Sequence, residues 1–294
     1  MRVVFEEFTT TRVDTGAATI NAVHGGSGPP VLLLHGFPQT HAMWHRVGPA
    51  LAREHTVVAA DLRGYGDSSR PPSDDDHAAY SFRAMAADQV ALMRALGHER
   101  FAVVGHDRGG RVAHRMALDH PDAVTRLAVL DIVPTLHVYE TVDRALATAY
   151  YHWFLFIQPA PLPERLIEGD PIGYLHALLG GWGSSGIAVF APEALAEYER
   201  CFADAQTRHA MMEDYRAGAS IDLEHDRADR DRPVEAPMLV VWGGRGVVGS
   251  RPEDPLTVWR GWAADVRGTA VDAGHFLVEE RPAEVLGLLA GFLR

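Results

Sequence analysis

The segment Gly105–Gly109, GHDRG, places Asp107 where a side chain could do covalent chemistry. The apolar run Phe101–Val104 precedes it and a helix-like stretch follows, which predicts a strand, a sharp turn and a helix. Small residues on both sides permit a strained turn that exposes the central side chain. A carboxylate in that position attacks saturated carbon and forms an ester that water must cleave, whereas serine would indicate acyl transfer. An ordinary glycine-flanked turn has the same short pattern, so context must decide.

Ester cleavage needs a general base, and His275 follows Gly274 after the last expected strand. A third residue, an acid, orients such a histidine, and it often stands in the loop after the preceding strand in a W-G-x-x-D pattern. Gly246 occupies that position here, in the glycine-rich stretch Gly244–Gly249, to which the sequence assigns no function. The acid is therefore predicted to be Asp131. The alternative is that Asp131 only caps a helix or stabilises a turn.

Apolar runs and helical spacing predict the elements that hold these residues. Strands alternate with helices, which predicts a doubly wound, mostly parallel sheet with ligands at the carboxyl ends of its strands. The expected strands are a pair, Phe5–Val13 and Ala17–Val23, then Val31–Leu34, Thr56–Ala60, Phe101–Val104, Arg126–Leu130, Met238–Trp242 and Gly268–Asp272. The expected helices are Ala42–Ala52, Ser81–Leu96 with Ser81 as N-cap, and Ala283–Leu293.

Composition changes after Pro134. Residues 135–218 lack strand-like runs and carry many aromatic residues in helical stretches, so we expect a helical lid inserted into the α/β domain. The predicted division is a core domain of residues 1–134 and 219–294 and a lid of residues 135–218. A charged connector, Asp222–Arg232, is expected to lead back to the core.

Composition also limits the function. With 294 residues, 47% of them apolar, the chain can bury a large core. A net charge of −12 argues against nucleic acid and anionic membranes as partners, so an anionic substrate would need local cations. No apolar run approaches the roughly 18 residues of a membrane span, and Met1–Val4 leads into acidic residues, unlike a signal peptide. One cysteine, Cys201, excludes an internal disulfide, and we expect a cytoplasmic protein.

Several motifs together resemble the fluoroacetate (haloacetate) dehalogenases of the α/β-hydrolase superfamily, over nearly the whole chain. The resemblance implies the α/β-hydrolase fold, conversion of haloacetate to glycolate and halide, no metal or organic cofactor, and a homodimer. The motifs are HGFPQ at His35–Gln39, DLRGYGDS at Asp61–Ser68, GHDRGGRVAHRMALDHP at Gly105–Pro121, LDIVP at Leu130–Pro134, YHW at Tyr151–Trp153 and GGW at Gly180–Trp182.

Arginine after the nucleophile distinguishes this chain from the related haloalkane dehalogenases and epoxide hydrolases, which usually carry tryptophan there. Arg108 and Arg111 are three residues apart on the expected helix, so both guanidinium groups can reach one side of the turn. Arginine binds a carboxylate with two parallel hydrogen bonds, and the resemblance assigns the substrate carboxylate to this pair. A pair of surface arginines is the alternative.

The same resemblance assigns halide binding to His152, Trp153 and Tyr215, whose N–H and O–H groups can donate to a leaving anion. Next to Tyr215, Glu213 and Asp214 indicate a solvated face. The remaining assignments are the backbone N–H groups of Phe37 and Arg108 as oxyanion hole, with His106 and Trp182 lining the pocket.

Two other functions compete with dehalogenation. An epoxide hydrolase shares the Asp–His–Asp logic but needs two lid tyrosines, for which Tyr150, Tyr151 and Tyr215 are available, while Arg108 argues against it. A non-catalytic ligand-binding protein is a third alternative, against which the intact set of nucleophile, base and acid argues. The sequence does not decide which halogen is removed, because cleavage of C–F depends on fine donor geometry.

Overall fold

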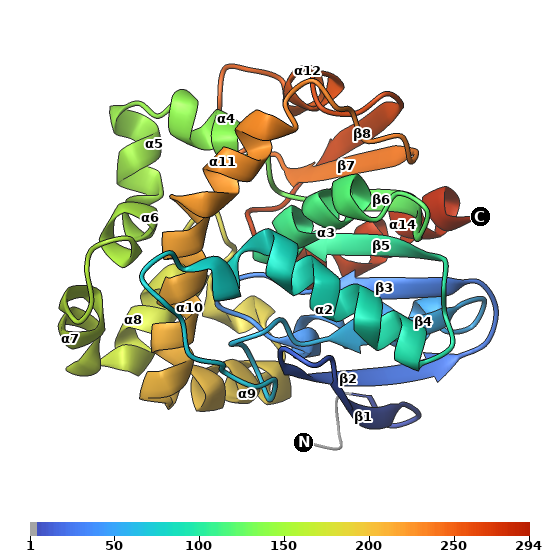
Figure 1. Cartoon of the computed structure of the whole chain (residues 1–294), viewed down its shortest axis with the longest axis horizontal. Helices are drawn as coiled ribbons and strands as arrows, with labels where there is room; N and C mark the ends of the chain where they lie inside the picture. Colours follow the sequence, from blue (N-terminus) through green and yellow to red (C-terminus); the bar gives the residue numbers. More distant parts are fainter. Residues whose placement is uncertain (1–4) are drawn as a thin grey trace.

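The apolar runs become buried strands of one eight-stranded sheet in the computed structural model, which describes residues 5–294 (Figure 1). The strand order is β1-β2-β4-β3-β5-β6-β7-β8, and every pair from β4 onwards is parallel. β1 and β2 pair antiparallel with each other, and β2 pairs antiparallel with β4. The strands are β1 Thr9–Asp14, β2 Thr19–Gly26, β3 Pro30–Leu34, β4 Thr56–Ala60, β5 Phe101–His106, β6 Val124–Leu130, β7 Met238–Gly243 and β8 Val266–Val271. The prediction of a mostly parallel, doubly wound sheet is confirmed.

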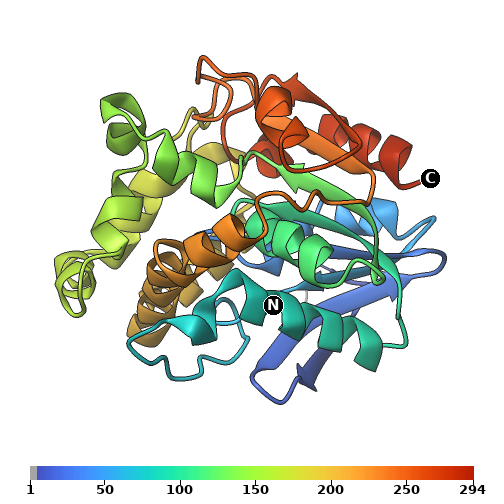
Figure 2. The same ribbon diagram turned by 45° about the horizontal axis from the view of Figure 1, so that its top comes forward.

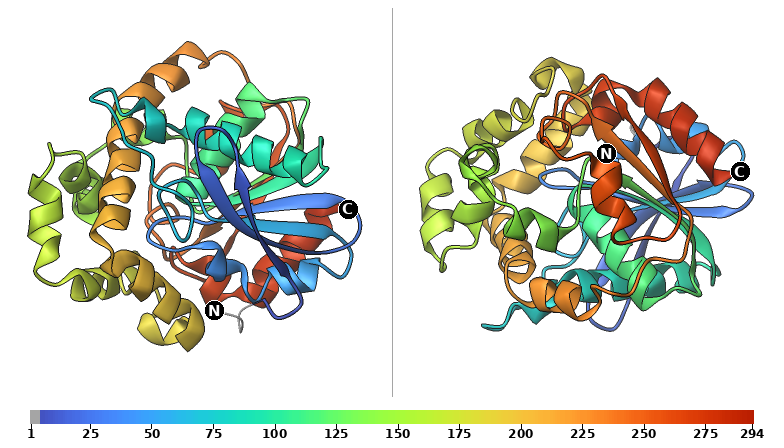
Figure 3. Two further views of the ribbon diagram at one scale, coloured as in Figure 1. Left: turned by 60° about the horizontal axis from the view of Figure 1, so that its bottom comes forward. Right: turned by 90° about the horizontal axis from the view of Figure 1, so that it is seen from above.

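Helices cover both faces of this sheet. Seen from above, α14 lies on the opposite face from α2 and α3 (Figure 3). The predicted N-cap of α2 is confirmed, because the Ser81 hydroxyl accepts a hydrogen bond from the Ala84 N–H at 3.2 Å. The core helices are η1 His41–Trp44, α1 Gly48–Leu51, η2 Ala78–Tyr80, α2 Phe82–Ala95, α3 Arg108–Asp119, α12 Pro255–Arg260, α13 Leu277–Glu280 and α14 Pro282–Leu293.

Residues 135–218, which we call the lid segment, are helical and lie beyond one end of the sheet (Figure 1). The helix α10 and the following α11 Ile221–Ala228 run back from this segment towards the core (Figure 2). The lid helices are α4 Thr135–Glu140, α5 Arg144–Ala149, α6 Tyr151–Phe156, α7 Leu162–Glu168, α8 Pro171–Leu179, η3 Ile187–Val189, α9 Pro192–Ala203 and α10 Ala205–Gly218. The division into core and lid domains stays a prediction.

The strand register brings the candidate residues to one edge of the sheet. His106 pairs with Leu130 across β5 and β6, so Asp107 and Asp131 follow neighbouring strand ends. Gly243 pairs with Val271 across β7 and β8, which places the loop containing His275 at the same edge. The carboxyl ends of parallel strands thus gather residues that are far apart in the sequence.

One expected element was wrong. The predicted helix Ala42–Ala52 is a 3-10 turn, η1, followed by the four-residue α1, so the two turns do not join into one helix. The charged connector Asp222–Arg232 leads back to the core, and its first part belongs to the helix α11, in which Asp222 and Leu223 are buried. Met1–Val4 lie outside the described residues. Within residues 5–294, no helix combines the length and apolar content that crossing a bilayer requires.

Candidate active site

Asp107 stands at the turn between β5 and α3 with a backbone φ of +46° and ψ of −116°. This conformation costs a non-glycine residue roughly 1–3 kcal/mol and must be held by its surroundings. The surroundings are tight: a Cβ on Gly105 would lie 2.2 Å from the Gly109 carbonyl oxygen, and one on Gly109 would lie 2.3 Å from that of His35. The glycines are therefore sterically required, and the ordinary-turn alternative does not describe this geometry.

His275 lies beside Asp107 and is oriented by Asp131. The distance from His275 Nδ1 to Asp131 Oδ2 is 2.6 Å, and Asp131 Oδ1 accepts the Gly243 N–H at 2.9 Å. His275 Nε2 lies 4.0 Å from Asp107 Oδ2, so these two groups are neighbours without a direct hydrogen bond. All three side chains are buried. Asp107 Oδ2 is therefore not hydrogen-bonded to His275, and His275 Nε2 is the ring nitrogen nearer to it.

The pKa values of these groups follow from burial and from one another. Burial alone would raise the pKa of Asp107, but the positive charges of His275, His106 and the two arginines lower it to about 2. Burial alone would lower the pKa of His275, but the hydrogen bond and charge of Asp131, with the charge of Asp107, raise it above its ordinary value. Asp107 is therefore ionised at neutral pH, as a nucleophilic carboxylate must be.

One Asp107 oxygen is already held by a backbone donor. The Phe37 N–H donates to Asp107 Oδ1 at 2.8 Å, and Arg108, the other expected oxyanion residue, begins α3 directly after the nucleophile. Gly36 allows this approach, since a Cβ there would lie 2.4 Å from Asp107 Cβ. Oδ2 is consequently the oxygen available to attack.

The loop after β7, which lacks the usual acid, lies against Asp131. A Cβ on Gly246 would lie 3.4 Å from Asp131 Oδ2, so a second carboxylate at this position would repel that of Asp131. The Gly246 N–H also closes the turn by donating to the Gly243 carbonyl oxygen at 3.0 Å. Glycine at position 246 is therefore compatible with Asp131, at the end of β6, as the acid that orients His275.

Arg108 and Arg111 are both buried, so the surface-pair alternative was wrong. Arg111 Nη1 donates to the Val133 carbonyl oxygen at 3.0 Å and to Thr135 Oγ1 at 2.8 Å, and its Nε is buried without a partner. Within residues 5–294 it forms no ion pair with a carboxylate. Burial lowers the pKa of Arg111, although the charge of Asp107 opposes this. Arg111 is thus a desolvated cation beside Asp107.

Arg108 differs, because Asp214 binds it. Asp214 Oδ2 accepts from Arg108 Nε at 2.8 Å, and the Asp214 backbone oxygen accepts from Nη2 at 2.7 Å. The solvated face expected for Glu213 and Asp214 was wrong: both are buried, and Glu213 pairs with Arg216 at 2.7 Å. Sequence reasoning missed Asp214 because its partner is 106 positions away.

The three expected halide donors lie close to one another in the lid segment. The His152 and Tyr215 ring centroids are 5.6 Å apart, and those of Trp153 and Tyr215 are 6.0 Å apart. Within residues 5–294, His152 Nδ1 is buried without a hydrogen-bond partner, and no hydrogen bond joins the Trp153 indole N–H or the Tyr215 hydroxyl to another residue. Burial lowers the pKa of His152 to about 3, so its ring is neutral at pH 7. Three donors therefore stand ready for an acceptor.

His106 and Trp182 support His275 from two sides. His106 Nε2–H donates to the His275 carbonyl oxygen at 2.8 Å, and the two rings are 4.7 Å apart. The Trp182 ring lies 4.6 Å from that of His152 and 5.3 Å from that of His275, while its indole N–H donates to the Ala149 carbonyl oxygen at 2.9 Å. Both residues therefore shape the site, and the Trp182 donor is already used.

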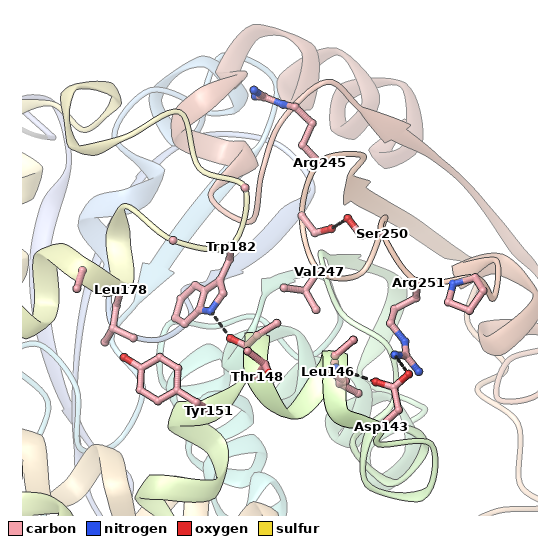
Figure 4. Close-up of a pocket in the computed structure, with 17 residues that line it drawn as sticks. Asp143, Leu146, Thr148, Tyr151, Leu178, Trp182, Arg245, Val247, Ser250 and Arg251 are labelled. Atoms are coloured by element: carbon pink, nitrogen blue, oxygen red, sulfur yellow. Dashed lines mark hydrogen bonds and ion pairs between the residues drawn. The ribbon is translucent and has the colours of Figure 1, made fainter.

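A cavity of about 560 Å³ lies between the lid segment and the loop after β7, and Figure 4 shows Trp182 and Tyr151 on its lid side and Val247 opposite. Asp107 does not line it. Its arginines are occupied, since Arg251 pairs with Asp143 at 2.9 Å and Arg245 with Glu280 at 3.2 Å. We therefore place the chemistry at Asp107 rather than in this cavity. Nowhere in the described part of the chain do three or more His, Cys, Asp or Glu side chains form a metal-binding group.

Known proteins resemble this chain over most of its length. A family model described as alpha/beta hydrolase fold matches residues 29–282. A fluoroacetate dehalogenase from Burkholderia sp is 52% identical over 99% of this chain and 95% of its own length. A soluble epoxide hydrolase from Corynebacterium sp. (strain C12) is 35% identical over 90% of each chain. A solved structure from Nostoc sp PCC 7120, assigned to the alpha/beta hydrolases, superposes with a TM-score of 0.96 at 55% identity, covering 98% of this chain and 99% of its own.

Proposed function

This chain belongs to the alpha/beta hydrolase family, and we propose that it is a hydrolytic dehalogenase that converts haloacetate, including fluoroacetate, to glycolate and halide. The observation that carries the proposal is the juxtaposition of an ionised Asp107, a buried Arg111 without a carboxylate partner in the described chain, and three unpartnered lid donors. A haloacetate offers one group to each: an electrophilic carbon, a carboxylate and a halogen. The similarity to a fluoroacetate dehalogenase supports the same substrate class.

In the first step, Asp107 Oδ2 attacks the α-carbon of haloacetate while the carbon–halogen bond breaks and its electron pair leaves with the halide. Phe37 holds the other carboxylate oxygen at 2.8 Å, which directs Oδ2 towards the substrate. Arg111, with the available nitrogen of Arg108, binds the substrate carboxylate and fixes the α-carbon in front of the nucleophile. The product is a carboxymethyl ester of Asp107.

In the second step, His275 Nε2 takes a proton from water, whose oxygen attacks the ester carbon of Asp107. Negative charge then develops on Oδ1, where the Phe37 N–H, and in this proposal the Arg108 N–H, stabilise it. The bond to Oδ2 breaks, glycolate leaves with that oxygen and the proton from His275, and Asp107 keeps the oxygen from water. The remaining proton passes to solvent. Esterification removes the charge of Asp107, which had helped to raise the pKa of His275, so the histidine is more readily neutral when it is needed.

The lid donors assist departure of the halide. Neutral His152, Trp153 and Tyr215 can each donate one hydrogen bond to the same anion without protonating the nucleophile. Such donors accelerate the reaction because their hydrogen bonds strengthen as negative charge develops on the leaving atom.

An epoxide hydrolase fits the same core but fits this lid less well. Its mechanism needs two lid tyrosines aimed at the epoxide oxygen. Tyr151 is 44% exposed, and the Tyr150 ring stacks on Trp153 at 5.4 Å. Tyr215 lies near Asp107, and an uncharged epoxide would leave the buried Arg111 without an anionic partner from the substrate. The core geometry also argues against a non-catalytic binding protein.

The cytoplasmic location and the homodimer expected from the sequence stay predictions of this proposal. Size-exclusion chromatography with light scattering would test the homodimer.

Halide release from fluoro-, chloro- and bromoacetate, compared with chloroacetamide and a simple epoxide, tests the proposed function. We expect halide and glycolate from haloacetates, much slower reaction of the uncharged amide and no diol from the epoxide. Opening of the epoxide without halide release from any haloacetate would contradict the proposal. Single turnover in ¹⁸O-labelled water should leave the label in Asp107 and not in the first glycolate.

A further inference from the structure

Asp214 binds the arginine next to the nucleophile from the lid segment. It is fully buried in α10, and its carboxylate and backbone oxygen take both Nε and Nη2 of Arg108, including a close contact between Nη2 and Oδ1. The Tyr65 hydroxyl donates to the same carboxylate at 2.7 Å. Asp214 therefore joins the lid to the helix that carries the nucleophile.

Arg108 is enclosed on its remaining sides. Its guanidinium carbon lies 4.7 Å from the Phe82 ring centroid and 4.3 Å from that of Tyr215. A Cβ on Gly218 would come within 3.0 Å of Nη2, so glycine there leaves room for the side chain. No hydrogen bond to Nη1 occurs within residues 5–294. Arg108 is thus fixed in one position with one nitrogen left for substrate.

The charges of Arg108 and Arg111 are consequently compensated to different extents. Arg108 is neutralised by the adjacent Asp214, whereas Arg111 is held by the neutral acceptors Val133 and Thr135. If Arg108 were absent, Asp214 would be a buried, unpaired anion close to the position of the substrate carboxylate, and the two would repel each other. With Arg108, Arg111 and Asp214 all charged, the pocket therefore has one net positive charge, which one substrate carboxylate neutralises.

We propose that Asp214 is a positioning and specificity residue that fixes Arg108 as a one-nitrogen donor and cancels its charge, so that Arg111 supplies the net charge that selects a monoanionic haloacid. This inference rests on the proposed function. It assigns unequal roles to two arginines that the motif treats alike.

The test is a rescue experiment with four proteins: wild type, Arg108→Met, Asp214→Asn and the double variant. Arg108→Met leaves Asp214 unpaired, so we expect its kcat/KM for chloroacetate to fall by about 10³. The double variant removes both charges, so its kcat/KM for chloroacetate should be about tenfold higher than that of Arg108→Met. Asp214→Asn alone should lower kcat by about tenfold without raising KM, because Arg108 loses its alignment while the positive charge of the pocket increases.

Chloroacetamide separates charge from folding, since an uncharged substrate should show no rescue in the double variant. Glu197→Gln is the matched control: it breaks another lid ion pair, to Arg200 at 2.6 Å, and should leave the kinetics unchanged. Affinity for glycolate, measured by calorimetry, should follow the same rescue pattern without depending on turnover. A double variant as poor as or worse than Arg108→Met, in both kinetics and glycolate affinity, would overturn the inference. Absence of halide release by the wild type would instead overturn the proposed function.

Discussion

The core and the lid hold their site residues by different means. In the core, Asp107, Asp131 and His275 follow strand ends, and hydrogen bonds to Phe37 and Gly243 fix the oxygens of the two carboxylates. On the lid side, the donors of Trp153 and Tyr215 have no partner in the described chain and are placed by aromatic packing. In the proposed function, the core thus carries the covalent chemistry and the arginines for the substrate carboxylate, and the lid carries the donors for the halide. Variants on the two sides should fail in different ways.

The largest effect is expected from Asp107→Asn. Because an amide does not displace halide, kcat for chloroacetate should fall by on the order of 10⁵ or more. Halide release measures this loss. Asp119→Asn, at the far end of the same helix, is the matched control and should remain active. Substantial turnover by Asp107→Asn, with no reversion to aspartate detected by mass spectrometry, would place the nucleophile elsewhere.

The next effect concerns the lid donors and discriminates between halides. Fluoride is a poorer leaving group than chloride, so its departure depends more on hydrogen bonds that strengthen in the transition state. Losing one such donor costs roughly 2.7–4 kcal/mol, so Trp153→Phe and Tyr215→Phe should each lower fluoroacetate kcat/KM by about 10²–10³ and chloroacetate kcat/KM much less. His152→Ala should shift the ratio in the same direction.

Trp182→Phe provides the control for this ratio. Its indole N–H is used by the Ala149 carbonyl oxygen, so its loss should affect both substrates equally. Equal losses of fluoroacetate and chloroacetate turnover in Trp153→Phe and Tyr215→Phe would mean that these side chains only shape the cavity.

Arg111→Ala tests selection for the carboxylate. Removing this partner of a buried anion should lower kcat/KM for haloacetate by on the order of 10² or more. Arg111→Lys should not restore it, because lysine lacks the planar fork that also reaches Val133 and Thr135. The kcat/KM for chloroacetamide should change little in Arg111→Ala. If wild type turns over the amide as well as the acid, Arg111 does not select carboxylates.

The smallest effect is on the pH profile. His275 must be neutral to act as a base, and its pKa in the free enzyme is raised by Asp131 and Asp107 despite burial. Only hydrolysis of the ester uses His275 as a base, so this step should be lost as pH falls, whereas ester formation should not. Because esterified Asp107 carries no charge, hydrolysis should be lost at a pH below the raised pKa of His275 in the free enzyme. Rapid-quench measurement follows the rate of each step against pH, and loss of both steps at the same pH would contradict the assignment.

Sequence predicted the core better than the lid for a physical reason. The β5 strand, the turn and α3 were predicted correctly because an apolar run and closely spaced glycines are local signals. The burial of Asp214 was not predicted, because only the fold brings this residue to Arg108. In the sequence, Asp214 stands next to Glu213, and two adjacent acids usually indicate a solvent-exposed face. The expected Ala42–Ala52 helix failed for a local reason, because Pro49 stands at the start of α1 and lacks the N–H that a continuous helix would need there.

The strand ends show the same limit within the core. The position of Asp131 after β6 could be predicted from order along the chain, and its pairing with His275 is a close contact in the structure. That Gly246 approaches Asp131 Oδ2 could not be predicted, because it depends on how the loop after β7 folds back over β6. Geometry between segments, rather than residue type, decides these contacts.

Trapping the ester in His275→Ala tests the central claim most directly. This variant keeps Asp107 as nucleophile but lacks the base that activates water, so one equivalent of halide should be released from chloroacetate. Intact-protein and peptide mass spectrometry should then find a stable carboxymethyl group on the peptide that contains Asp107. An adduct on another residue, or steady multiple turnover without any adduct, would contradict the account.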